Sequence, residues 1–283
     1  MNNIVFIADF FVDEMLGGGE LNNEEFIKIS AEKGYKLSKI NSHLVNLDWL
    51  RNNEEHNYII SNFVGLRPDC KEYITKNLNY VIYEHDHKYL LTRNPAIYEN
   101  FIAPKEHIIN RDFYQRARAV LCQSKFHKDI IEKNLNFNNI MNLGGNIWSL
   151  EALQKMREYT SKDKRHKCSI MNSEIPHKNT IGAKIYCARK RKEYELIPAL
   201  KYYDFLNRIS NNDTLVFFPK TPETLSRIAV EARMMGMKVL TNNLVGATSE
   251  EWFKLKGFDL IDMMTNKREE IFNKTLGTLE NAK

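Results

Sequence analysis

Two carboxylates and an arginine stand at a spacing that suits the binding of a polar, charged ligand. Glu223 and Glu231 are eight residues apart, with Arg227 midway between them, in the segment FFPKTPETLSRIAVEARMMG. A helix over this segment would place all three on one stripe, at roughly 0°, 40° and 80° around its axis. Thr221 would be its N-cap and Pro222 its first residue. Simple ion pairing on a surface helix gives the same pattern, so the elements around it must decide.

Those elements alternate along the whole chain. Short apolar runs such as NIVFIADFF, NYVIYEHD and TLVFFP are separated by helical patterns, which predicts parallel sheets with crossover helices. A charged connector follows residue 160, and the alternation then begins again. We therefore expect two α/β domains, residues 1–160 and 161–283, with the last helix crossing back to the first. In such sheets ligands bind at the carboxyl ends of strands.

The composition is that of a soluble globular protein, with 43% hydrophobic and 27% charged residues. Residues 1–160 carry 19 Lys and Arg against 21 Asp and Glu, whereas residues 161–283 carry 22 against 15. The second half is therefore the better candidate for holding an anionic ligand. The four cysteines form no Cys-x-x-Cys pair, which favours a reduced compartment. The N-terminal run lacks a basic segment, and no run has the length of a membrane span.

The segment from Pro219 through Glu223 and Glu231 to Gly236 resembles the E-x7-E region of the family 4 group of retaining glycosyltransferases. This resemblance implies the GT-B fold, in which two Rossmann-like α/β domains face each other across a cleft. It also implies that Glu223 contacts a donor sugar and that Glu231 holds the ribose of a nucleotide. The family has glycines directly after the first glutamate. This chain has Thr224 there, which we assign to the donor-binding residues.

The segment NSEIPHKN extends the resemblance to the start of the second domain. The family has a Gly-Arg pair here and a lysine five residues after that arginine. Lys178 matches the lysine, and Ser173 stands where the arginine is expected. We expect Lys178 to neutralise a departing diphosphate, because negative charge builds up there as the sugar leaves. Arg227 is our inferred replacement for the arginine, and Ser173 stays among the donor-binding candidates.

Two stretches of the first half complete the predicted site. LGGGE resembles the family's Gly-Gly-x-Glu loop, which implies that Gly18 and Gly19 let the backbone approach the donor phosphate. YEHDHKY follows a predicted strand, and family members often have a histidine near this point. His85 or Asp86 could therefore contact the sugar or assist an acceptor hydroxyl, although a role as a helix cap or loop residue is equally open. We expect no metal site.

The resemblance implies a retaining transfer of a hexosyl or pentosyl group from a nucleotide diphosphate sugar. We expect a UDP-sugar as donor and no further cofactor. The chain also resembles compact phage-encoded glycosyltransferases, some of which modify hydroxymethylated pyrimidines in DNA. Such DNA is the expected acceptor, and a saccharide or surface polysaccharide is the alternative. A second alternative is a non-catalytic module that binds nucleotide sugars or nucleic acid. We expect a cytoplasmic protein, in the host if the chain is viral, and leave its oligomeric state open.

Overall fold

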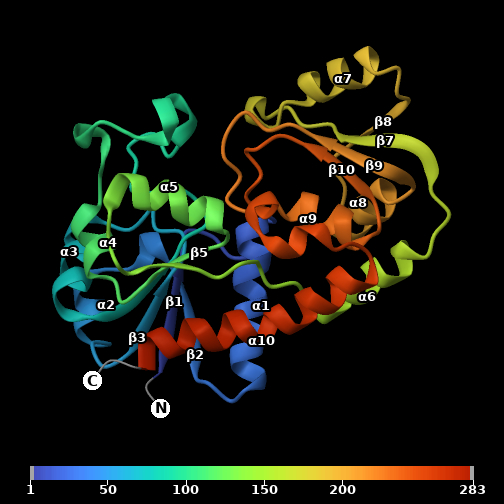
Figure 1. The fold of residues 1–283 in the computed structure, drawn as a ribbon. Helices are drawn as coiled ribbons and strands as arrows, with labels where there is room; N and C mark the ends of the chain where they lie inside the picture. The colour runs from blue at the N-terminus through green and yellow to red at the C-terminus, as the bar shows by residue number, and fades with distance from the viewer. Residues whose placement is uncertain (1–2, 281–283) are drawn as a thin grey trace. The chain divides into compact units, whose positions relative to one another are not determined.

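The computed structural model describes residues 3–280 and forms two compact units (Figure 1). The first comprises the chain up to Ile147 together with the residues from Arg268 onward, and the second comprises Trp148–Lys267. The expected boundary between the two domains is residue 160. The division falls earlier because the helix α6 (Leu150–Thr160) buries Leu153 and Met156 in the core of the second unit.

The first unit is built on a six-stranded sheet in which every strand pairing is parallel. Its strand order is β2-β1-β3-β4-β5-β6. The strands are β1 (Ile4–Ala8), β2 (Leu37–Asn41), β3 (Asn57–Ile60), β4 (Asn79–Tyr83), β5 (Val120–Cys122) and β6 (Ile140–Asn142). The helices are α1 (Gly18–Glu32), α2 (Leu47–Arg51), α3 (Pro68–Asn77), α4 (Arg111–Arg116), α5 (Lys125–Leu135) and the end of α10 (Phe258–Glu280). Short 3-10 turns are η1 (Ser42–Leu44), η2 (Pro95–Ile97), η3 (Glu99–Phe101) and η4 (Lys105–His107).

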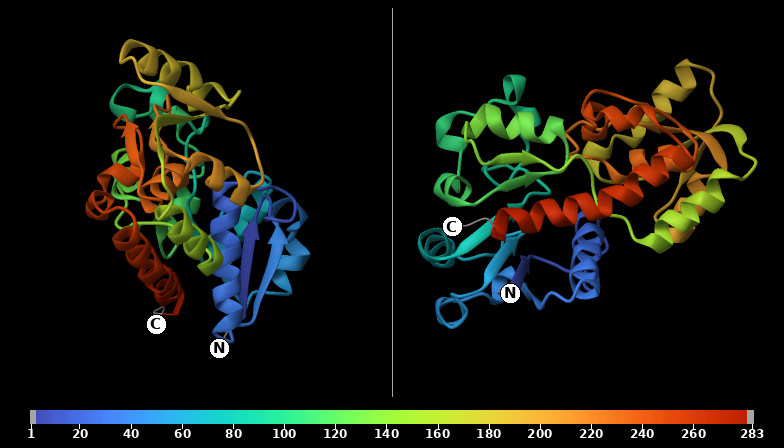
Figure 2. Two further views of the ribbon diagram at one scale, coloured as in Figure 1. Left: turned by 90° about the vertical axis from the view of Figure 1, so that its right-hand side faces the viewer. Right: turned by 60° about the horizontal axis from the view of Figure 1, so that its bottom comes forward.

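The apolar runs of these strands are covered on both faces, as their lack of alternation predicts. Val5 and Ile7 of β1 pack toward α2 to α5, whereas Phe6 packs toward α1 and α10. Successive side chains of a strand point to opposite faces, so one strand supplies both cores. The C-terminal part of α10 lies along this sheet and adds Ile271 and Phe272 to the core (Figures 1 and 2). A buried ion pair between Arg268 and Glu25, 3.2 Å between Nη1 and Oε2, joins α10 to α1.

The second unit has a four-stranded parallel sheet of order β10-β9-β7-β8. Its strands are β7 (Arg165–Met171), β8 (Tyr194–Ile197), β9 (Asn212–Phe217) and β10 (Lys238–Thr241). Its other elements are α6, α7 (Thr180–Arg189), α8 (Tyr202–Ile209), α9 (Arg227–Met234), η5 (Pro176–Lys178), η6 (Gly246–Ser249), η7 (Glu251–Lys254) and the start of α10. The helices α6, α8 and α9 share the larger core with β9, whereas α7 packs on the other face through Ala183 and Cys187.

The expected α/β architecture with two parallel sheets is confirmed. The segment SEEWFKLKG, residues 249–257, has a helical sequence pattern but contains only the last residue of η6 and the 3-10 turn η7. The expected last helix is α10, and residues 281–283 lie outside the described part of the chain. Within residues 3–280, no helix combines the length and the apolar composition that a membrane crossing requires.

Candidate functional site

The carboxyl ends of β7 and β9 form the natural ligand position of the second unit. From β7 the chain first adds β8 on one side and later β9 on the other, so the direction of winding reverses between β7 and β9. At such a point the two following loops leave in opposite directions, and ligands of open α/β sheets bind there. The loop after β7 carries Lys178 and the loop after β9 carries Glu223.

Asn179 fixes the loop that carries Lys178. Its backbone is left-handed, with φ of 57°, and its side-chain oxygen accepts a hydrogen bond from Gly182 N at the start of α7. Its amide nitrogen donates to Phe218 O across the sheet end, at 2.8 Å. Lys220 N donates to His177 O at 2.8 Å, which ties the two loops together a second time. The backbone at Lys178 is therefore held to the end of β9.

Glu223 lies on an extended segment, so the predicted helix start at Thr221 and Pro222 is wrong. Glu223 N donates to Leu244 O at 2.8 Å and Gly246 N donates to Glu223 O at 2.9 Å, which is a one-residue parallel bridge. These bonds use the backbone groups that a helix would need. The helix α9 begins only at Arg227. The predicted stripe of three charges on one helix is thus reduced to Arg227 and Glu231.

The structure nevertheless brings Lys178 and Glu223 together. The Lys178 ammonium lies 2.8 Å from Glu223 Oε1, and it sits 5.8 Å from the ring centre of Phe217, the last residue of β9. Both side chains retain some solvent exposure, 26% for Lys178 and 16% for Glu223. A paired ammonium and carboxylate at the sheet end can bind a ligand that offers an anion to one and a hydroxyl to the other.

Glu231 belongs to a second, more buried cluster. Its Oε1 accepts hydrogen bonds from Trp148 Nε1 at 3.0 Å and from the Tyr202 hydroxyl at 2.8 Å. Arg227 lies 3.5 Å from the same oxygen, and its guanidinium stacks 4.5 Å above the Trp148 ring. Burial, followed by the charge of Glu231, holds the pKa of Tyr202 well above its usual value. Arg227 is thus positioned by Glu231 and Trp148.

Sequence reasoning missed Trp148 and Tyr202. They reach Glu231 from segments 83 and 29 residues away, so no local pattern connects them. The available signal was chemical, because a buried indole N–H or phenol needs a hydrogen-bond partner.

Ser173, a predicted donor-binding residue, stabilises its own loop. Its hydroxyl accepts a hydrogen bond from Ile175 N at 3.2 Å, and its backbone N donates to Thr180 Oγ1 at 3.1 Å.

Thr224 is half-buried directly after Glu223, on the same extended segment. Its neighbour Leu225 is fully buried, and Ala247 N donates to Leu225 O at 2.9 Å. The segment is therefore fixed on both sides of Thr224, which stays adjacent to the Lys178–Glu223 pair.

In the first unit, Gly18 and Gly19 are the first two residues of α1, so the glycine segment does not precede the helix as predicted. A Cβ added at Gly19 would lie 3.4 Å from Cγ of His85, which shows that the imidazole packs directly against this helix start. Gln123 donates its side-chain N–H to His85 Nδ1, and His85 Nε2 lies 2.8 Å from Asn23 Oδ1. The structure thus places His85 and Gly19, two of the predicted site residues, next to each other.

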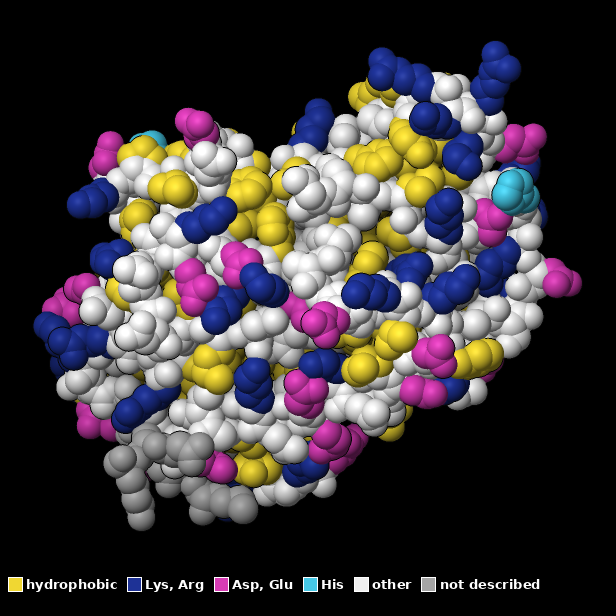
Figure 3. Space-filling view, viewed as in Figure 1, with side chains coloured by type: hydrophobic (Ala, Val, Ile, Leu, Met, Phe, Trp, Pro, Cys, Tyr) yellow, Lys and Arg dark blue, Asp and Glu magenta, His cyan; other side chains and the backbone are white. Residues whose placement is uncertain are grey.

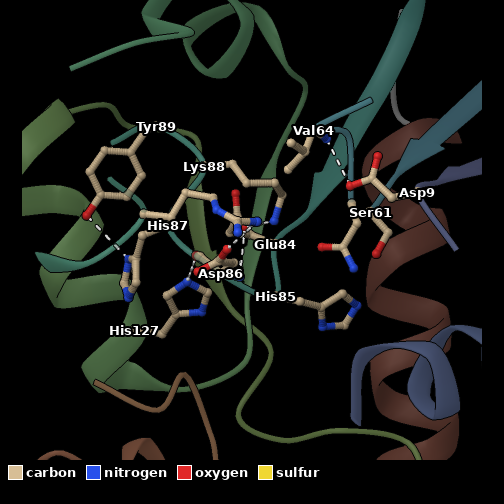
Figure 4. A network of polar contacts seen from close by, with 12 residues as sticks. Asp9, Ser61, Val64, Glu84, His85, Asp86, His87, Lys88, Tyr89 and His127 are labelled. Carbon is tan, nitrogen blue, oxygen red and sulfur yellow. Dashed lines mark hydrogen bonds and ion pairs between the residues drawn. The ribbon is translucent and has the colours of Figure 1, made fainter. Parts of the chain in front are cut away.

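The three residues after Glu84 point in different directions, as Figure 4 shows. The Asp86 carboxylate pairs with Arg93 at 3.4 Å, whereas the Asp86 carbonyl oxygen accepts from His127 Nε2 at 2.9 Å. His87 is buried and meets the His127 ring edge to face at 5.1 Å. Asp86 and His85 therefore have separate partners. Among residues 3–280, no group of three or more metal-binding side chains forms a metal site.

His127 gives a pH dependence that can be measured. Burial lowers its pKa from 6.5 to about 3, so the folded protein binds fewer protons than the unfolded chain between these values. The contribution of His127 to the free energy of unfolding is therefore complete above pH 6.5. It falls as the pH is lowered, by about 2 kcal/mol at pH 5. We expect urea unfolding at pH 7.5 and 5 to show this loss, and His127→Gln to reduce it. An unchanged loss in that variant would contradict the assignment.

The fold of this chain is similar to that of several solved structures, although its sequence has no match among protein families or curated proteins. Among solved structures, the catalytic domain of starch synthase IV from Arabidopsis thaliana, bound to ADP and acarbose, is 9% identical, with a TM-score of 0.62 over 97% of this chain and 95% of that one. HepE from Anabaena, bound to UDP and glucose, is 13% identical, with a TM-score of 0.52 over 98% and 95%.

An alpha-glucosyltransferase bound to UDP-glucose and to DNA with an abasic site is 10% identical, with a TM-score of 0.50 over 100% of this chain and 96% of that one. These likenesses cover both units, and each of these proteins is a glycosyltransferase of GT-B architecture. At these identities they establish the fold: the chain has the α/β architecture of GT-B proteins, with two parallel sheets and their helices.

Proposed function

We propose that this protein is a glycosyltransferase that moves a sugar from a nucleotide diphosphate sugar to an acceptor hydroxyl. The observation that carries the proposal is the Lys178–Glu223 pair at the carboxyl ends of β7 and β9. The pair lies where this sheet topology receives its ligand. The solved structures of the same fold that hold UDP or ADP support a nucleotide sugar as that ligand.

In the proposed reaction, the Lys178 ammonium binds the diphosphate and neutralises the charge that develops as the sugar–oxygen bond breaks. Glu223 accepts hydrogen bonds from sugar hydroxyls and positions the ring. Trp148 and Tyr202 both donate to Oε1 of Glu231, so we assign Oε2 to the ribose hydroxyls. Transfer with retention of configuration is the stereochemistry we propose, and a UDP-sugar is the donor to test first.

In this proposal the second unit binds the donor and the first unit serves the acceptor. For the acceptor we propose a hydroxymethylated pyrimidine in DNA, which the likeness to a DNA-bound alpha-glucosyltransferase supports. The excess of basic residues after residue 160 suits a polyanion. A saccharide acceptor is the second candidate, supported by the likeness to starch synthase IV. Binding to a DNA acceptor should weaken steeply with salt, whereas binding to a saccharide should not.

The decisive experiment is a nucleotide-release assay with UDP-, GDP- and ADP-sugars. Each donor is tested with hydroxymethylated DNA, with plain DNA, with oligosaccharides and without acceptor. Release that requires hydroxymethylated DNA would support the full proposal, and release that requires an oligosaccharide would support the second acceptor. If no donor is turned over but one raises the melting temperature, the chain is a binding module. If no donor is turned over and none raises the melting temperature, the glycosyltransferase assignment is contradicted.

A further inference from the structure

The helix α7 presents an apolar stripe to solvent. It packs on the sheet through Ala183 and Cys187. At about 100° per residue, Ile181 and Ile185 lie on the opposite side of the helix. The two residues are 72% and 47% exposed. Two large aliphatic side chains one turn apart, both facing water, form a small apolar strip whose burial against an apolar layer would be favourable.

Cations flank this stripe on both sides. By the same geometry Lys184 lies roughly 60–100° to one side of the two isoleucines, and Arg189 lies roughly 40–80° to the other. Lys190, Arg191 and Lys192 follow directly after the helix, and all three are exposed. Figure 3 shows dark-blue side chains around yellow ones at the upper right, where Figure 1 draws α7.

These five cations also lack carboxylate partners. Within residues 3–280, no ion pair or side-chain hydrogen bond involves Lys184, Arg189, Lys190, Arg191 or Lys192. By contrast, Lys167 on the neighbouring strand β7 pairs with Glu193 at 2.9 Å. An exposed positive charge without an internal partner remains available to an external anion. The stripe and its flanking cations therefore form a single surface, which we call the α7 face.

We propose that the α7 face docks on the surface of an anionic lipid membrane. A lipid surface matches both features: isoleucines insert among acyl chains while lysines and arginines remain at the headgroup level. A nucleic acid offers phosphates but no apolar layer to cover the isoleucines. The helix lies flat on the bilayer in this arrangement and does not span it. The inference is independent of the proposed glycosyl transfer, because it concerns a surface outside the Lys178–Glu223 pair.

Flotation with vesicles tests this proposal on the full chain. We expect recovery with phosphatidylcholine vesicles containing 30% phosphatidylglycerol, little recovery with phosphatidylcholine alone, and release in 1 M NaCl. Ile181→Ser with Ile185→Ser should weaken binding at least about tenfold, because the buried apolar contact is lost. Lys184→Gln with Arg189→Gln should weaken it about 25-fold, since each cation near an anionic surface contributes about fivefold.

The matched control removes one arginine and one lysine that already have partners. Arg51→Gln with Lys76→Gln changes exposed cations paired with Asp48 and Glu72, and should leave vesicle binding within about twofold. Circular dichroism and melting temperature verify that every variant is folded. Absence of wild-type binding to anionic vesicles would overturn the proposal, as would an equal loss in the control. Binding of duplex DNA that depends on the cations but not on Ile181 and Ile185, without vesicle binding, would assign the face to nucleic acid instead.

Discussion

Replacing Lys178 with alanine is expected to lower kcat with a nucleotide sugar by about 100- to 1,000-fold. The ammonium is the cation that the structure places at the carboxyl ends of β7 and β9, 2.8 Å from Glu223. Charge on the departing diphosphate is greatest in the transition state, so loss of the cation should act on kcat more than on KM. Initial rates with the donor identified by nucleotide release would measure the effect.

Lys220→Ala is the matched control for this prediction. Lys220 is an exposed lysine of the neighbouring loop after β9, and the loop is tied through its backbone N–H, which alanine keeps. Its rate should stay near wild type. The Lys178–Glu223 pair is partly exposed, so its loss should change the free energy of unfolding by about 1 kcal/mol or less. A rate loss in both variants, or in neither, would contradict the role assigned to Lys178.

The segment around Glu223 shows why local pattern predicted the wrong helix start. Thr221 and Pro222 have the residue types of a helix N-terminus, and the spacing from Glu223 to Glu231 fits a helical stripe. The segment instead pairs with residues 244–247, more than twenty residues later, and Ser226 adopts a left-handed φ of 75° just before α9. A hydrogen-bonding partner that distant leaves no local signal, so tertiary pairing overrode the propensity.

In the six-stranded sheet, strand prediction succeeded where the strand is buried on both faces and failed at the two edges. β1 and β4 are continuous apolar runs inside the six-stranded sheet, and both were predicted. β2 and β6 are the two edge strands and were missed. β2 reads LSKIN and is half-exposed, and β6 has three residues. An edge strand needs burial on fewer sides, so its sequence carries less apolar patterning.

In the candidate site, residues that follow a strand directly were predicted, whereas residues brought in by distant helices were not. Lys178 was predicted from the loop after one strand and Glu223 from a helix expected after another, and parallel strands bring their carboxyl ends to one edge. The N-cap of α5 is likewise a local feature, because Ser124 Oγ accepts a hydrogen bond from His127 N, three residues later, at 3.1 Å. Trp148 and Tyr202 required knowledge of which helices meet α9. Local chemistry is therefore visible in the sequence, whereas contacts between distant helices are not.

A buried ion pair in the first unit gives the largest expected effect on stability. Glu84 directly follows β4 and its side chain is fully buried. The side chain of Lys88, which pairs with it, is only 2% exposed (Figure 4). Lys88 and Asp86 N donate to Glu84 Oε1, the latter at 2.8 Å, and the Tyr114 hydroxyl donates to Oε2. Burial raises the pKa of Glu84, and the charge of Lys88 opposes that rise.

Lys88→Met is therefore expected to lower the free energy of unfolding by about 3–5 kcal/mol at pH 8, measured by urea denaturation. It leaves the Glu84 carboxylate buried without its cation. A raised carboxyl pKa means that the folded protein binds more protons than the unfolded chain, so this contribution to stability falls as pH rises. Removal of Lys88 raises that pKa further. The variant should accordingly lose most stability at alkaline pH and recover part of it near pH 5.

Two further variants separate the buried charge from the loss of a lysine as such. Lys76→Met removes a lysine at the same i, i+4 spacing from a glutamate, but both Lys76 and Glu72 are about two-thirds exposed, so the cost should stay below about 1 kcal/mol. Glu84→Gln combined with Lys88→Met removes both charges, and should regain most of the stability because no unpaired carboxylate remains. If the double variant were as unstable as Lys88→Met, packing of the lysine stem over Phe63, whose ring centre lies 5.5 Å from Nζ, would be the dominant contribution instead.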